Sequence, residues 1–96
     1  MKRDKAIRLL KTHRAELSAR GVKSLALFGS VARNEAGHAS DIDILVDFAG
    51  PATFDGFMET KFYLESLLGC RVDLVVRQAL KPRMRPVVER EAIYVA

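Results

Sequence analysis

The 96 residues are enough for one domain with a modest core, and the 49% hydrophobic and 29% charged residues are typical of globular proteins. The formal net charge is +4, and no apolar run approaches the roughly 20 residues of a membrane span. The basic first residues are not followed by an apolar stretch, which argues against a signal peptide, and Cys70 as the only cysteine excludes an internal disulfide. We therefore expect one domain over 1–96, located in a reducing cytoplasm and not in a membrane.

The first predicted element is an amphipathic helix over 3–19, with Gly21 as its stop signal. Its apolar face consists of Ile7, Leu10 and Leu17. Basic residues cover its other face and recur near the end of the chain. They are Lys2, Arg3, Lys5, Arg8, Lys11, Arg14, Arg20, Arg77, Lys81, Arg83, Arg85 and Arg90. Such clusters could contact nucleic acid, an acidic partner or phosphates, but solvated helix faces are the commoner case. Because no aromatic residues are interleaved with them for base stacking, we do not expect direct nucleic-acid binding.

The next segment predicts a strand over 23–28 that ends at Gly29 and Ser30. A short helix should begin at 31–33, followed by a polar loop over 34–40. Glycine permits close approach of the backbone to a ligand. A serine at a helix start offers a hydroxyl and a backbone N–H to an anion. The turn is therefore a candidate phosphate site.

A second strand, over 41–48, begins with two acids, Asp41 and Asp43. Residues two apart on a strand point to the same face, so both carboxylates aim at one spot. They repel each other unless a cation lies between them. Mg²⁺ suits such oxygen ligands, because it binds carboxylates together with substrate phosphates. The strand should place Ile42, Ile44, Val46 and Phe48 on a core face, and Asp41, Asp43, Leu45 and Asp47 on an acidic face.

The second half of the chain predicts a helix over 54–68, capped by Thr53 and ended by Gly69. Its apolar residues at helical spacing are expected in the core. They are Phe54, Phe57, Met58, Phe62, Leu64, Leu67 and Leu68. A third strand should cover 71–76, and a short last helix should start at Lys81-Pro82, limited by Pro86. An edge strand over 91–95 ends the chain.

Asp73 is isolated inside the apolar third strand. If this strand lies beside the second, all three acids converge on one side of the sheet. A charge within a strand is costly unless it is paired or metal-bound. Structural explanations stay open: Asp41 could be a cap, and Asp73 could pair with Arg71 or Arg77. The chemistry that uses all three acids is phosphoryl or nucleotidyl transfer assisted by one or two Mg²⁺ ions.

The segment LALFGSVARNEAGHASDIDILVDF, residues 25–48, closely resembles the signature of the DNA polymerase β-like nucleotidyltransferase superfamily. More narrowly, it is similar to the minimal nucleotidyltransferase (MNT) branch. The pattern of Gly-Ser, ten residues and Asp-x-Asp is complete, and Asp73 in RVDLV stands where the family has its third acid. The resemblance implies an α/β (α+β) nucleotidyltransferase fold, in which a small mixed sheet has helices packed mainly on one face.

The resemblance also implies roles for individual residues. Asp41 and Asp43 would be metal ligands, and Asp73 would be a ligand of the second metal or the base that primes the acceptor hydroxyl. The triphosphate of ATP would be held by Gly29 and Ser30. Arg33 would either contact a phosphate or remain a surface residue.

Stand-alone domains of this branch are often encoded beside a small helical HEPN protein. The pair resembles a toxin–antitoxin system in which the MNT protein transfers AMP from ATP to a tyrosine of the HEPN ribonuclease. We therefore expect a Mg²⁺-dependent protein adenylyltransferase that acts as an antitoxin with a HEPN-type partner. Two alternatives remain: an antitoxin that neutralises its partner by binding alone, and a nucleotidyltransferase that acts on RNA or a small molecule.

Overall fold

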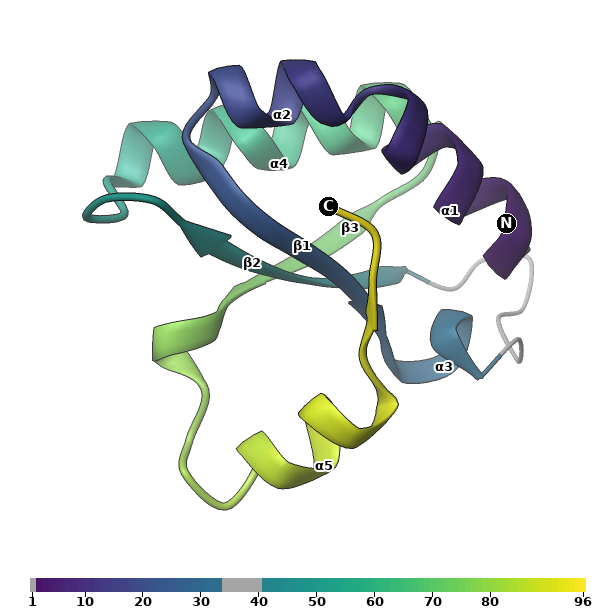
Figure 1. Ribbon diagram of the computed structural model, residues 1–96, viewed down its shortest axis with the longest axis vertical. Helices are drawn as coiled ribbons and strands as arrows, with labels where there is room; N and C mark the ends of the chain where they lie inside the picture. Colours follow the sequence, from purple (N-terminus) through teal and green to yellow (C-terminus); the bar gives the residue numbers. More distant parts are fainter. Residues whose placement is uncertain (1, 34–40) are drawn as a thin grey trace.

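A mixed β-sheet forms the middle layer of the computed structural model, which describes residues 2–33 and 41–96 (Figure 1). Within these residues the sheet has four strands in the order β3-β2-β1-β4. They are β1 (Val22–Phe28), β2 (Ile42–Phe48), β3 (Val72–Val76) and β4 (Ile93–Tyr94). The central strand β1 is antiparallel to β2 and to β4, whereas β2 and β3 are parallel. The expected mixed sheet is confirmed, and β3 and β4 are its edges.

Most of the helices cover one face of this sheet, as expected, and one lies across the opposite face (Figure 1). The covering helices are α1 (Arg3–Thr12), α2 (Arg14–Ala19) and α4 (Phe54–Leu68). The opposite face carries α5 (Arg85–Glu91). Two short elements follow strands directly, α3 (Gly29–Ala32) after β1 and η1 (Arg77–Ala79) after β3. Among the described residues the longest helix is α4 with 15 residues, and no helix is suited to cross a membrane.

The larger core lies between the sheet and the helices α1, α2 and α4. Every second residue of the strands packs into this core, as the sequence predicted for β2. Its buried strand side chains are Leu25, Leu27, Ile42, Ile44, Val46, Val72 and Leu74. Full burial of each such side chain contributes about 1.5–3 kcal/mol. This face of the sheet therefore anchors the strands that carry the acids on the other face.

A second, smaller core lies between the sheet and α5. It consists of Ala26, Leu45 and Val88, and the half-buried Phe28 and Val75 pack against it. Leu45 is only 2% exposed, so a buried apolar residue lies between the acids on the strand face that we expected to be acidic. Apolar packing under α5 interrupts the acids along β2 between Asp43 and Asp47.

The first helix differs from the prediction, because the segment 3–19 forms two helices that meet at His13. The backbone of His13 has φ −104° and ψ 23°, which turns the chain out of the first helix. Its Nδ1 atom lies 2.9 Å from the carbonyl oxygen of Leu9. The break lets Leu10 and Leu17 both reach the core, where each is fully buried.

Helix α4 has the predicted bounds, and both end signals act as expected. The Thr53 hydroxyl accepts a hydrogen bond from the backbone N–H of Gly56 at 3.0 Å, and Gly69 ends the helix at φ 71°. The predicted buried face is wrong at two positions, because Phe54 and Phe62 are 77% and 58% exposed. Phe62 lies on the side of the helix opposite the buried Thr60 and Leu64, whereas Phe54 is the first residue of the helix.

The C-terminal elements are shifted from their predicted positions. The last helix starts at Arg85, not at Lys81, and the proline in its first turn is Pro86. Because this helix continues to Glu91, the edge strand is shorter than the predicted 91–95. Val95 still donates a backbone hydrogen bond to Leu25 at 2.9 Å. The polar loop predicted over 34–40 lies outside the described residues.

Candidate functional site

Two of the predicted acids meet on the sheet face that also carries α5. The parallel register of β2 and β3 pairs Asp43 directly with Asp73. Asp43 is half-buried, and Asp73 is exposed at the edge of the sheet. Burial of Asp43, together with the charge and a hydrogen bond of the neighbouring Asp73, raises the pKa of Asp43 above its ordinary value. The arrangement is therefore a close carboxylate pair that resists carrying two negative charges.

Gly29 lies against this pair. The antiparallel register of β1 and β2 pairs Phe28 with Asp43, so the next residue of the chain passes beside the Asp43 side chain. Gly29 has φ 70°, a left-handed conformation that favours glycine. A Cβ atom at this position would overlap Asp43 Oδ2 and would lie 3.1 Å from its Cγ. Both the conformation and the contact thus require glycine here.

The rest of the predicted turn is described in part. Ser30 lies in α3 directly after Gly29, but its side chain is outside the described part of the chain. Arg33 follows this helix, and its Nη1 donates a hydrogen bond to Glu91 Oε2 at 2.7 Å. The positive charge of Arg33 also acts to lower the pKa of Asp43. Arg33 thus lies within electrostatic range of the acids while it connects α3 to α5.

Asp41 lies apart from the other two acids, just before β2. Its Oδ1 is 4.0 Å from Arg71 Nε, and both side chains are largely exposed. An exposed pair of this kind contributes little to stability. The alternative that Asp73 pairs with Arg71 or Arg77 is wrong, because Arg71 pairs with Asp41 and Arg77 pairs with Glu89. Within residues 2–33 and 41–96, no three acidic, histidine or cysteine side chains are grouped as a ready metal site.

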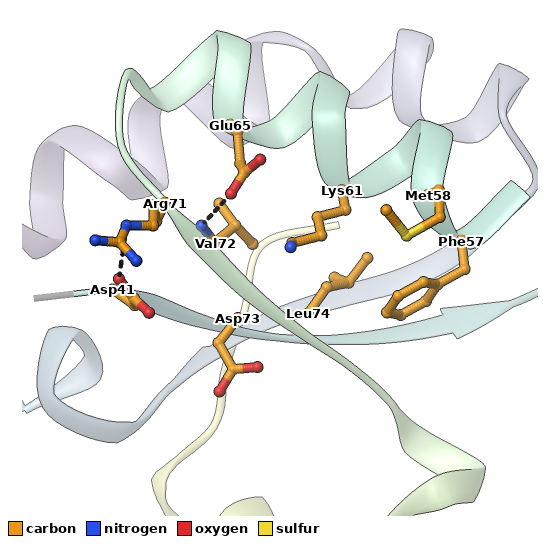
Figure 2. Close-up of a pocket in the computed structure, with 9 residues that line it drawn as sticks. All are labelled: Asp41, Phe57, Met58, Lys61, Glu65, Arg71, Val72, Asp73 and Leu74. Carbon is orange, nitrogen blue, oxygen red and sulfur yellow. Dashed lines mark hydrogen bonds and ion pairs between the residues drawn. The ribbon is translucent and has the colours of Figure 1, made fainter. Parts of the chain in front are cut away.

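A groove of about 320 Å³ lies between α4 and β3, beside the acids (Figure 2). Its residues are Asp41, Phe57, Met58, Lys61, Glu65, Arg71, Val72, Asp73 and Leu74. Figure 2 shows Lys61 and Glu65 extending from α4 toward β3, whereas the Asp73 side chain points to the other face of the sheet. The Glu65 carboxylate accepts a hydrogen bond from the backbone N–H of Val72 at 3.0 Å.

Sequence reasoning missed two residues of this region, Glu65 and Glu91. Each contacts a partner far along the chain or across a loop, Val72 for Glu65 and Arg33 for Glu91. Neither contact follows from a local motif. The available signal for Glu65 was an acid within the last turns of the helix, four residues after Lys61 and on the same side.

The Asp43–Asp73 pair has the chemistry of a divalent-cation site. All its donors are carboxylate oxygens, which Mg²⁺ prefers, and a cation between them would relieve the repulsion that raises the pKa of Asp43. Asp41 contributes a further negative charge that acts on Asp43 in the same direction. The residues present therefore fit Mg²⁺.

Comparison with known proteins places the chain among proteins that transfer nucleotides. A family model described as "Nucleotidyltransferase domain" matches residues 10–95. The curated protein adenylyltransferase MntA of Thermococcus cleftensis is 47% identical over 88 residues, which are 91% of this chain and 89% of that protein. The residues that the family model matches include all six that were predicted for the site.

Solved structures give the same result for the fold. A structure described as that of a proposed minimal nucleotidyltransferase superposes with a TM-score of 0.85 at 39% identity and covers 97% of this chain and 95% of its own. A toxin–antitoxin crystal structure with AMP-PNP gives a TM-score of 0.72 at 25% identity and covers 100% of this chain and 73% of its own.

Proposed function

The chain belongs to the nucleotidyltransferase domain family, and from this we propose that it is a Mg²⁺-dependent protein adenylyltransferase that acts as an antitoxin. It transfers AMP from ATP to a tyrosine of a HEPN-type toxin. The observation that carries this proposal is the Asp43–Asp73 pair in register beside Gly29. Two relatives support the choice of reaction: one is named a protein adenylyltransferase, and the other is a toxin–antitoxin complex with an ATP analogue.

Asp43 and Asp73 would hold one or two Mg²⁺ ions, and Asp41, which lies apart from them just before β2, would be a further ligand. When bound, the metal neutralises charge on the leaving pyrophosphate and lowers the pKa of the attacking hydroxyl. Asp43 is the more buried member of the pair and touches the Gly29 turn, so it faces the nucleotide. Asp73 is exposed on an edge strand, so it faces the acceptor.

The nucleotide side of the site is the Gly29-Ser30 turn with Arg33. The missing side chain at Gly29 lets the Asp43 carboxylate lie directly against the turn that would bind the triphosphate. Arg33 supplies positive charge at the other end of the same short helix, and Glu91 fixes its direction. Phosphate oxygens are the ligands that a guanidinium binds best.

The transfer step forms one bond and breaks one. The tyrosine oxygen forms a bond to the α-phosphorus of ATP, and the bond from this phosphorus to the oxygen bridging to the β-phosphate breaks. Pyrophosphate leaves with that bonding pair. Asp73 takes the hydroxyl proton as the base. In the alternative role it would be a ligand of the second metal, and the proton would leave to water. Both roles require Asp73 to be ionised.

The proposal is tested by mixing the purified chain with the product of the adjacent gene, Mg²⁺ and ATP labelled at the α-phosphate. We expect label on the partner protein, with AMP mapped to a tyrosine by mass spectrometry and lost when that tyrosine is changed to Phe. Label on added RNA but not on protein would favour the RNA or small-molecule alternative. If the variant with Asn at all three acids still bound and silenced the partner, neutralisation by binding alone would be correct.

A further inference from the structure

Among the described residues no strand pairs with the outer edge of β3, which lies next to the Asp43–Asp73 pair. We propose that the acceptor segment of the partner protein binds along this edge as an added β-strand, with alternate side chains in the groove under α4. This inference rests on the proposed function, because it names the surface that brings the acceptor hydroxyl to the site. The bound segment is extended, and its hydroxyl residue is flanked by apolar and acidic residues.

The backbone of β3 offers the hydrogen bonds that such a strand needs. The carbonyl of Arg71 accepts from the N–H of Ile42, so Arg71 and every second residue after it face β2. Val72 faces outward, since its N–H donates to the Glu65 side chain and not to a strand. By the same alternation the N–H and C=O groups of Leu74 and the N–H of Val76 point out of the sheet, whereas the C=O of Val76 begins η1. Edges of this kind accept peptides by strand addition.

The register of the sheet determines where the side chains of an added strand point. Directly paired residues on neighbouring strands share a face, which is why Asp43 and Asp73 lie side by side. A residue paired with Asp73 on its open side would point to that same face. Neighbouring strands lie about 4.7–4.9 Å apart, so its hydroxyl would reach the Asp73 carboxylate. Asp43, Asp73 and the acceptor residue of the added strand would thus lie side by side on one face of the sheet.

The residues before and after the acceptor would point to the opposite face, into the groove of Figure 2. Phe57, Met58 and Leu74 make the apolar part of this groove. Lys61 is half-buried there, and within the described part of the chain it has no hydrogen bond or ion pair. The acids of the groove, Asp41, Glu65 and Asp73, form no ion pair with Lys61, so an acidic side chain on the bound segment could pair with it. The groove therefore complements an apolar and acidic flank.

The first test reverses the charge in the groove. We compare Lys61→Glu with Lys23→Glu, an exposed lysine on β1 that makes the same charge change away from β3. Lys61→Glu should lower kcat/KM for the partner protein about tenfold through KM, as expected for a charge at an interface. Lys23→Glu should stay within about twofold of the wild type, the range for a surface charge without a partner. Equal effects of the two variants would overturn the proposal.

The second test does not depend on catalysis. Amide hydrogen exchange is measured on the wild-type chain with and without the adjacent gene's product. We expect exchange at Leu74 and Val76 to slow about tenfold or more on binding, while the other sheet edge, β4, is unchanged. Protection of β4 but not of β3, or of neither, would overturn the proposal. Protection of β3 without any AMP transfer would instead retain the docking surface and reject the proposed reaction.

Discussion

Gly29 and Asp43 lie in contact, although Asp43 follows 14 positions later in the sequence. The contact exists because β1 and β2 pair in the register that sets Phe28 opposite Asp43. It brings the end of one strand against a carboxylate in the middle of the next. The two halves of the sequence motif, Gly-Ser and Asp-x-Asp, thereby become one site.

A methyl group at position 29 should therefore cost more stability than at any comparable glycine. Gly69→Ala is the matched control, because Gly69 has nearly the same φ of 71° but no atom within 4 Å of its added Cβ. The control should lose only the left-handed penalty of about 1–2 kcal/mol. Gly29→Ala should lose about 1–3 kcal/mol more, from overlap with Asp43. Urea unfolding of both variants measures the difference.

The overlap can be separated from the backbone effect by a double-mutant cycle with Asp43→Ala. In that background Gly29→Ala should cost no more than Gly69→Ala, since the carboxylate that it meets is gone. A Gly29→Ala cost equal to that of Gly69→Ala in the wild-type background would show that the contact is not tight.

The raised pKa of Asp43 predicts how the metal-free protein responds to pH. Burial first, and then the charge of Asp73, raise this pKa in the folded state. A raised folded-state pKa means that the group favours folding below its unfolded pKa, and that this stability is lost as the pH rises through the folded value. Ionised Asp43 should thus destabilise the metal-free fold at neutral pH.

Asp43→Asn should accordingly raise the melting temperature at pH 7 in the presence of EDTA by a few degrees, on the order of the shift for a fraction of 1 kcal/mol. The gain should shrink as the pH falls below the unfolded pKa of aspartate. Asp47→Asn is the control on the same strand, because Asp47 accepts a hydrogen bond from Gln78 and is not paired with an acid on β3. If both variants shift the melting temperature equally, the repulsion assigned to Asp43 and Asp73 is wrong.

Mg²⁺ should reverse this pattern. A cation that binds only the folded state stabilises it in proportion to the logarithm of its concentration. The wild-type melting temperature should therefore rise with Mg²⁺, and the rise should be lost in Asp43→Asn and in Asp73→Asn. Thermal scans at increasing MgCl₂ concentration, with NaCl at matched ionic strength as the control, measure it. An identical rise in wild type and variants would mean that Mg²⁺ binds elsewhere.

The ion pair between Arg33 and Glu91 should affect the nucleotide and not the fold. Both side chains are partly exposed, so breaking the pair should cost less than about 1 kcal/mol of stability. Glu91→Gln should raise KM for ATP severalfold, because Arg33 loses the contact that directs it. Glu89→Gln breaks the equivalent pair with Arg77 on the same helix and should leave KM for ATP unchanged. Steady-state kinetics of the two variants decide this prediction.

The parts of the fold that were predictable from the sequence depend on short-range signals. Thr53 and Gly69 mark the ends of α4, and strict alternation assigns Ile42 and Ile44 to the core face. The wrong predictions have a common physical origin, because they concern which side of a helix packs against the rest of the protein. Helical periodicity predicted that Phe54 and Phe62 lie in the core. They are exposed to solvent, because the position of the sheet determines which side of the helix is buried.

The same limit applies to the site. Residue types and spacing indicated the acids and the glycine turn. The strand registers that bring them together, β1 with β2 and β2 with β3, depend on tertiary structure. Nothing local predicts that Asp73 pairs with Asp43 or that Asp41 lies with Arg71. The start of the last helix was ambiguous for a different reason, because Pro82 and Pro86 are both compatible with a first turn.

The most direct test of the central claim is the single-turnover rate of AMP transfer from ATP to the partner protein in Mg²⁺. Asp43→Asn and Asp73→Asn should each lower this rate at least about a hundredfold, equivalent to roughly 2.7 kcal/mol of transition-state stabilisation. Asp47→Asn, on the same strand and face as Asp43, should stay within about threefold of the wild type. Transfer by Asp43→Asn at the rate of Asp47→Asn would contradict the catalytic role of the Asp43–Asp73 pair.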